Sequence, residues 1–85
     1  MPAKTVIVGS SIGLHARPAA IIAEEVVKAG VPVFLSLDGG EPVDAGSALM
    51  IMTLGAGNGA QVTVACDDAD VLNTVARLVQ QDLDA

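Results

Sequence analysis

Two stretches of the sequence constrain its fold more than any other feature. In each of them apolar residues recur at helical spacing, and we call these patterns the first and the second helical repeat. In the first repeat, apolar residues recur at i, i+3, i+4 and i+7, the spacing that lines one face of a helix; they are Ala19, Ile22, Ala23 and Val26. Pro18 suits the first turn of this helix, and Gly30 followed by Pro32 would end it. The second repeat follows the aspartates Asp67, Asp68 and Asp70, and its apolar positions are Val71, Leu72, Val75, Leu78, Val79 and Leu83. Each apolar face has to be buried against another layer of structure.

Short β-branched and apolar runs supply that other layer. We expect strands over residues 5–8, 31–37, 41–44 and 61–66, the last with Val62, Val64 and Cys66 on one side. Asp38-Gly39-Gly40 is a hairpin signal between the second and third strands. A short helix is predicted over residues 48–54, because Ser47 suits its N-cap and Gly55 its C-cap. The order β-α-β-β-α-β-α predicts an α+β open-faced sandwich, a four-stranded antiparallel sheet with two long helices and one short helix on one face.

Length and charge exclude several classes of protein. Eighty-five residues make one domain, and the net charge of −6 comes from ten carboxylates and only four cations. There is no basic stripe, so binding to nucleic acid or to an anionic membrane surface is disfavoured. No apolar run approaches the roughly 20 residues that span a bilayer, and the N-terminus does not resemble a secretory signal. A single cysteine fits a reducing compartment, and we expect a cytoplasmic protein.

His15 and Arg17 stand out in so acidic a chain. His15 is the only histidine, and Arg17 is one of two arginines. A lone histidine is more often a surface residue than a functional one, but this histidine is expected to lie where a helix begins. Unpaired N–H groups and the positive end of the helix dipole bind anions there. Neutral imidazole is a nucleophile, and an arginine can pair with phosphate oxygens through two N–H groups, so the pattern predicts a histidine that carries a phosphoryl group.

Other kinds of site have weaker support. One histidine and one cysteine far apart in the sequence do not give the ligand spacing of a metal site. A Ser-His-Asp triad can be assembled from the residues present, but the chain has no nucleophile elbow and little room for a substrate pocket. The glycine-rich segment 55–59 lacks the lysine of a P-loop and precedes a strand. We expect neither a metal ion nor a cofactor.

The segment Gly13-Leu14-His15-Ala16-Arg17-Pro18-Ala19 is similar to the active-site signature of the HPr family, the histidine-containing phosphocarriers of the phosphoenolpyruvate–sugar phosphotransferase system. A second segment, residues 46–57, resembles the regulatory-serine helix of that family and the loop beyond it. The resemblance covers essentially the whole chain, in the same order of elements. A one-residue insertion near the turn at residues 38–40 moves the serine to position 47.

This resemblance implies a phosphoryl relay without a cofactor. Enzyme I, charged by phosphoenolpyruvate, would phosphorylate Nδ1 of His15, and the chain would then phosphorylate a histidine on a IIA component of a sugar permease. The chain would be a stoichiometric carrier and not an enzyme. Arg17 and the helix N-terminus, with Ala16 and Pro18, would support the phosphate. Partners would dock in turn on an apolar surface beside it, formed by Ala20, Ala48, Leu49 and Met52, while Ile51 and Leu54 face the core.

Regulation and pathway stay open from the sequence. In some family members a dedicated kinase, with a phosphorylase, acts on the serine that matches Ser47, and the added charge would oppose docking. Here Leu49-Met50 stands where a Met-Gly pair is common, and Gly46 stands where a lysine is. Another interpretation is a regulatory module that docks through Leu49 and Met52, and a third is a nitrogen-related or dihydroxyacetone-related relay. We expect a monomer.

Overall fold

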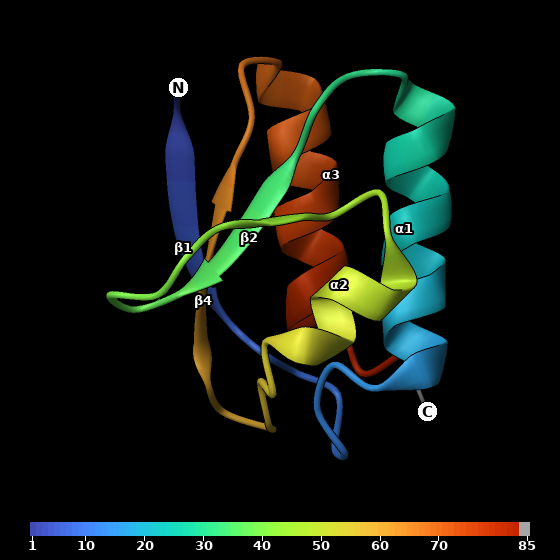
Figure 1. Cartoon of the computed structure of the whole chain (residues 1–85), viewed down its shortest axis with the longest axis vertical. Coiled ribbons are helices and arrows are strands. Elements are labelled where there is room, and N and C mark those ends of the chain that lie inside the picture. The colour runs from blue at the N-terminus through green and yellow to red at the C-terminus, as the bar shows by residue number, and fades with distance from the viewer. Residues whose placement is uncertain (84–85) are drawn as a thin grey trace.

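The computed structural model describes residues 1–83 and contains the seven elements in the expected order (Figure 1). The strands are β1 (Ala3–Ile7), β2 (Phe34–Leu37), β3 (Val43–Asp44) and β4 (Gln61–Ala65). The helices are α1 (Ala16–Ala29), α2 (Ala48–Thr53) and α3 (Ala69–Gln80). No described helix is both long and apolar enough to cross a membrane.

The four strands form one sheet in the order β1-β4-β2-β3, and each neighbouring pair is antiparallel. Side chains alternate between the two faces of this sheet. Val62 and Val64 of β4 are fully buried on the face that the helices cover. Thr5 and Thr63 are paired across β1 and β4, and their hydroxyl groups are hydrogen-bonded at 2.9 Å. The fold is the predicted α+β open-faced sandwich.

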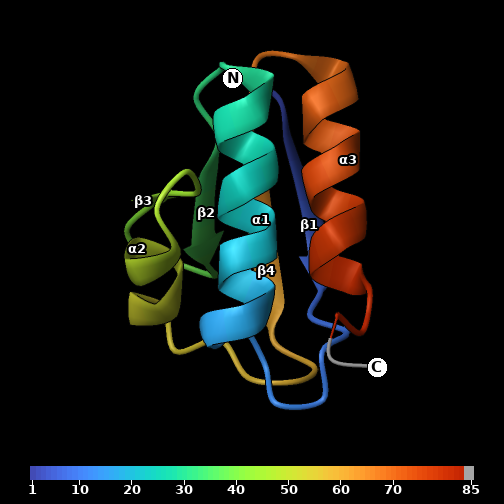
Figure 2. The same cartoon turned by 90° about the vertical axis from the view of Figure 1, so that its right-hand side faces the viewer.

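All three helices cover one face of the sheet (Figure 2). The helices α1 and α3 pack on each other, and α2 packs on α1 and β3. Between these layers lies an aliphatic core that includes all four residues of the first helical repeat, Ala19, Ile22, Ala23 and Val26. From the second repeat, Leu72, Val75 and Val79 are buried, while Val71 and Leu78 are half-buried against the core.

Several boundaries differ from the prediction. The strand β2 begins at Phe34 and not at residue 31, because Pro32 has no N–H for a ladder. Before Phe34, a cross-strand bond remains, from the N–H of Ala45 to the carbonyl of Val33 at 2.9 Å. Because Pro42 also has no N–H, it confines β3 to Val43–Asp44. The expected strand at 5–8 is the strand β1 over Ala3–Ile7.

Three other elements end earlier in the chain than the sequence predicts. The helix α2 ends at Thr53, with Leu54 as its C-cap. Cys66 lies one residue beyond β4 and is nevertheless fully buried. Leu83, expected on α3, follows the end of that helix and packs half-buried against the core.

Three connections meet at one end of the molecule. Val8 donates its N–H to the carbonyl of Ala60 at 2.9 Å, and Gly9 donates to the carbonyl of Val79 at 3.0 Å. The loop that enters α1, the loop between α2 and β4, and the segment after α3 therefore lie together (Figures 1 and 2). The N-terminus lies at the opposite end of the molecule.

Candidate functional site

His15 is the N-cap residue of α1. Its backbone is extended (φ −96°, ψ −161°), and its side chain does not cap the helix. The backbone N–H of His15 donates to the carbonyl of Gly13 at 3.0 Å, and its carbonyl accepts the N–H of Ala19 at 2.9 Å. The backbone alone therefore begins the helix, and the half-buried imidazole stands at the positive end of its dipole.

The first turn of α1 offers anion-binding groups beside the imidazole. The N–H groups of Ala16 and Arg17 have no hydrogen-bond acceptor among residues 1–83. The Arg17 side chain is exposed, and the first turn of the helix contains no acidic residue. Pro18 is buried and has no N–H, so it can support a phosphate only by setting the start of the helix.

Gly13 allows the loop before His15 to lie against the loop after α2. It has φ +88°, and a Cβ atom there would lie 2.4 Å from the carbonyl oxygen of Ala56 and 2.7 Å from Cα of Gly57. Leu14, the next residue, is buried and donates its N–H to the same carbonyl of Ala56 at 2.8 Å. Only glycine fits this close approach, which fixes the chain two residues before His15.

A shallow hollow with a volume of 270 Å³ lies beside His15. Its lining comes from the two loops and the end of α2: Ile12, Leu14, His15, Met52, Gly55, Ala56 and Gly57. Ile12 was not singled out in the sequence, although it is 68% exposed. An apolar side chain in an otherwise small and polar loop was the only signal available.

An apolar patch adjoins this hollow, and we define it as Ile12, Leu49 and Met52. Leu49 and Met52 are 69% and 37% exposed, and their spacing of three residues makes them neighbours on α2. Met52 and Ile12 line the same hollow. The exposure expected for Leu49 and Met52 is therefore present.

The other residues expected at this surface differ in exposure. Ala20 is exposed in the second turn of α1, while Ala48 is half-buried against the core. Ile51 is fully buried, as expected, and Leu54 is only half-buried. Within α2, one side chain therefore anchors the helix while its neighbours remain on the surface.

Ser47 is the N-cap of α2, as predicted. Its hydroxyl oxygen accepts the N–H of Met50 at 3.3 Å, and the Ser47 residue is half-buried. The preceding turn is held by Asp44, whose side chain accepts the N–H of Gly46 at 2.8 Å. Ser47 lies two residues before Leu49, so a modification there would place charge next to the apolar patch.

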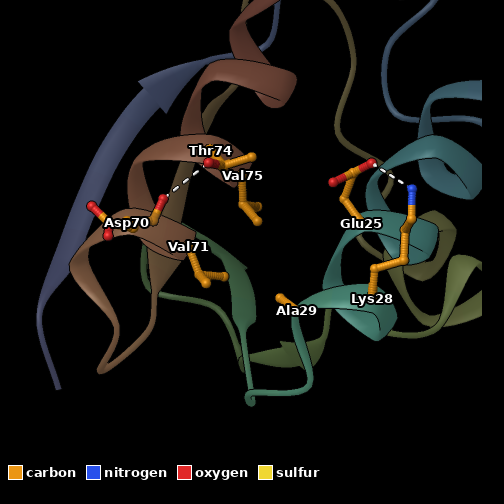
Figure 3. A pocket seen from close by; sticks show the side chains of 7 residues that line it. All are labelled: Glu25, Lys28, Ala29, Asp70, Val71, Thr74 and Val75. Atoms are coloured by element: carbon orange, nitrogen blue, oxygen red, sulfur yellow. Dashed lines mark hydrogen bonds and ion pairs between the residues drawn. The ribbon is translucent and has the colours of Figure 1, made fainter.

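A second hollow, of 310 Å³, lies between α1 and α3 (Figure 3). Ala29, Val71 and Val75 give it an apolar lining, and Glu25 and Lys28 form an ion pair at 3.6 Å on its rim. None of the predicted site residues lines it. No group of three or more His, Cys, Asp or Glu side chains within residues 1–83 is arranged to hold a metal ion.

Comparison with known proteins gives consistent matches over almost the whole chain. The family model described as "PTS HPr component phosphorylation site" matches residues 2–81. The phosphocarrier protein HPr of Streptomyces coelicolor is 38% identical over an alignment of 87 residues, which covers 99% of this chain and 94% of that protein.

Solved structures give the same match in three dimensions. The phosphocarrier protein HPr of Bacillus anthracis has a TM-score of 0.83 and 34% identity, covering 93% of this chain and 96% of that one. HPr-C-His from Thermoanaerobacter tengcongensis has a TM-score of 0.86 and 26% identity, covering 100% of this chain and 98% of that one.

Proposed function

Because this chain belongs to the HPr family of phosphocarriers of the phosphotransferase system, we propose that it accepts a phosphoryl group on His15 from phospho-Enzyme I. It then donates that group to IIA components of sugar permeases. The relay is cytoplasmic, and the carrier works as a monomer.

The observation that carries this proposal is the position of His15 at the start of α1. A phosphoryl group on the imidazole lies next to the N–H groups of Ala16 and Arg17 and to the positive end of the helix dipole. The Arg17 guanidinium makes no ion pair within residues 1–83, so it is available to pair with phosphate oxygens.

The transfer step needs positioning more than covalent chemistry. Nδ1 of His15 attacks the phosphorus atom, the P–N bond to His15 forms, and the bond from phosphorus to Enzyme I breaks. On the next partner the same exchange runs in the other direction, because His15 becomes the leaving group. A single arginine neutralises part of the phosphate charge without making the P–N bond too stable to transfer.

The apolar patch of Ile12, Leu49 and Met52 serves the docking of both partners. The exposed side chains bury apolar surface on each partner in turn, and methionine adapts to differently shaped surfaces. The half-buried Ala48 contributes its backbone and methyl group at the edge, and Ala20 offers a flat site on α1.

Ser47 is a candidate site for a serine kinase and phosphorylase. A phosphate on its hydroxyl lies at the N-terminus of α2, where the helix tolerates negative charge, and adjoins a surface that partners have to desolvate. Phosphorylation of Ser47 therefore weakens docking without unfolding α2.

A regulatory module that docks without phosphorylation of His15 is the second candidate function. It is favoured by one observation, the 69% exposure of Leu49 on a short helix. Such a module has no need of the histidine, so replacing His15 separates the two functions. A nitrogen-related or dihydroxyacetone-related relay keeps the same chemistry with different partners.

The test is intact-mass spectrometry after mixing the protein with phosphoenolpyruvate, Mg²⁺ and catalytic Enzyme I. We expect the wild type to gain one phosphate that is acid-labile and alkali-stable, and His15→Ala to gain none. No gain with an Enzyme I that is active on another carrier would contradict the proposed relay. A gain that persists in His15→Ala would place the phosphate on a different residue.

A further inference from the structure

The side chain of Asn58 reaches from the loop after α2 to the loop that leads to His15. Its Nδ2 atom donates to the carbonyl of Ser10 at 3.1 Å and lies 3.5 Å from the carbonyl of Gly9. Asn58 is an exposed residue, so these bonds are not a by-product of core packing. They join two segments that are 48 residues apart in the chain.

The carbonyl of Ser10 lies at the start of the turn that leads to His15, the proposed phosphoacceptor. It also accepts the N–H of Gly13 at 3.0 Å, and Gly13 in turn accepts the N–H of His15 at 3.0 Å. A donor that holds the carbonyl of Ser10 therefore acts on His15 through two successive hydrogen bonds of the backbone.

On its other side this turn is already fixed. The hydroxyl group of Ser10 is fully buried, donates to the carbonyl of Gln81 at 3.4 Å and accepts the N–H of Leu83 at 3.3 Å. Asn58 supplies the restraint from the opposite side, that of the loop after α2. Without it, the carbonyls of Gly9 and Ser10 lose their only side-chain donor among the described residues.

The loop that carries Asn58 also begins at the docking surface. Met52 of the apolar patch lies on α2, and the chain passes directly from this helix into the segment whose Ala56 carbonyl binds the N–H of Leu14 at 2.8 Å. Figure 2 shows the two loops crossing beneath α1. The segment after α2 therefore connects the proposed docking surface to the turn before His15.

We infer that Asn58 is a positioning residue for phosphoryl transfer at His15. Its amide holds the turn at residues 9–13 so that the imidazole meets the phosphorus of a docked partner in line. This role rests on the proposed function. It predicts that loss of the Asn58 amide slows transfer within the docked complex but does not weaken docking.

The test compares Asn58→Ala and Asn58→Asp with Asn73→Ala and Asn73→Asp. Asn73 is the only other asparagine, lies exposed on α3 and has no side-chain hydrogen bond within residues 1–83. The aspartate variant is nearly isosteric, but it replaces the N–H donors with oxygens that face two carbonyl groups. Urea unfolding of each variant verifies that the fold is retained.

The kinetic measurement is phosphoryl transfer from phosphoenolpyruvate through an Enzyme I that phosphorylates the wild-type protein, with the carrier as the varied substrate. For Asn58→Ala we expect kcat to fall about tenfold while KM stays within about twofold. Asn58→Asp should be at least as slow, and both Asn73 variants should match the wild type.

A second measurement does not depend on activity. In ¹H–¹⁵N spectra of the unphosphorylated protein, Asn58→Ala should shift the amide signals of residues 10–17, including that of His15. The inference is overturned if the signals at 13–15 stay in place, if kcat matches that of Asn73→Ala, or if KM alone rises. Wild-type protein that gains no phosphate would instead overturn the proposed function itself.

Discussion

Replacing Gly13 with alanine tests the geometry of the loop before His15. The substitution has two separable effects. An L-residue at φ +88° costs about 1–2 kcal/mol in the free energy of unfolding. The new Cβ atom would also lie 2.4 Å from the carbonyl oxygen of Ala56, and relief of this overlap costs about 1–3 kcal/mol more. We therefore expect Gly13→Ala to be destabilised by about 2–5 kcal/mol.

Gly59 supplies a matched control for the backbone effect. Its φ of +84° is almost the same as that of Gly13, but no atom lies within 4 Å of the site that a Cβ atom would occupy. Gly59→Ala should therefore lose only about 1–2 kcal/mol. Equilibrium urea unfolding followed by far-UV circular dichroism measures both variants, and the m-value should not change.

The same variant has a kinetic consequence. To reach ordinary contact at 3.4 Å, the two loops have to separate by about 1 Å, and a displacement of this size next to reacting groups can lower kcat by up to about a hundredfold. The reasoning is refuted if Gly13→Ala and Gly59→Ala agree in stability to within about 0.5 kcal/mol. In that case Ala56 and Gly13 do not constrain each other.

Substitutions at three further positions separate docking from stability. Leu49→Ser should change the unfolding free energy by less than about 0.5 kcal/mol, because the residue is 69% exposed, but it should raise the KM for transfer from Enzyme I; an unchanged KM would remove Leu49 from the docking surface. Ile51→Ala should lose about 2–5 kcal/mol in urea unfolding, since this side chain is fully buried, and a smaller loss would mean that α2 is not anchored by it. Ser47→Ala removes the cap on the N–H of Met50 and should cost about 1 kcal/mol, whereas Ser47→Asp should keep the cap and raise KM; a stable Ser47→Ala variant would contradict the capping role.

Much of the fold was predictable because the chain signals its layers locally. Four apolar residues of α1 recur at helical spacing and are all buried; they are Ala19, Ile22, Ala23 and Val26. The alternation of Val62 and Val64 identified the face of β4 that lies under the helices. The strand limits were predicted less well, because the end of a strand depends on where its partner strand ends. Pro32 and Pro42 lack the N–H group that a ladder needs, but this matters only once the partner strand is known.

The sequence predicts the chemistry proposed for the site, but it does not predict the contacts that hold the site in place. His15 and Arg17 are recognisable because cations are scarce and a helix begins beside them. The contact of Gly13 with Ala56 and the bonds of Asn58 join residues more than 40 positions apart. Nothing in the local sequence of either segment indicates which distant loop it will meet.

The opposite placement of the N-terminus and the start of α1 has a practical use (Figure 1). A biotin or peptide handle attached ahead of Met1 would hold the molecule on a sensor surface with His15 facing the solution. At the other end of the described chain, the N–H of Leu83 binds Ser10 in the turn before His15, so that end is tied to the candidate site. Immobilisation through the N-terminus therefore leaves both the histidine and the apolar patch open to partners in flow.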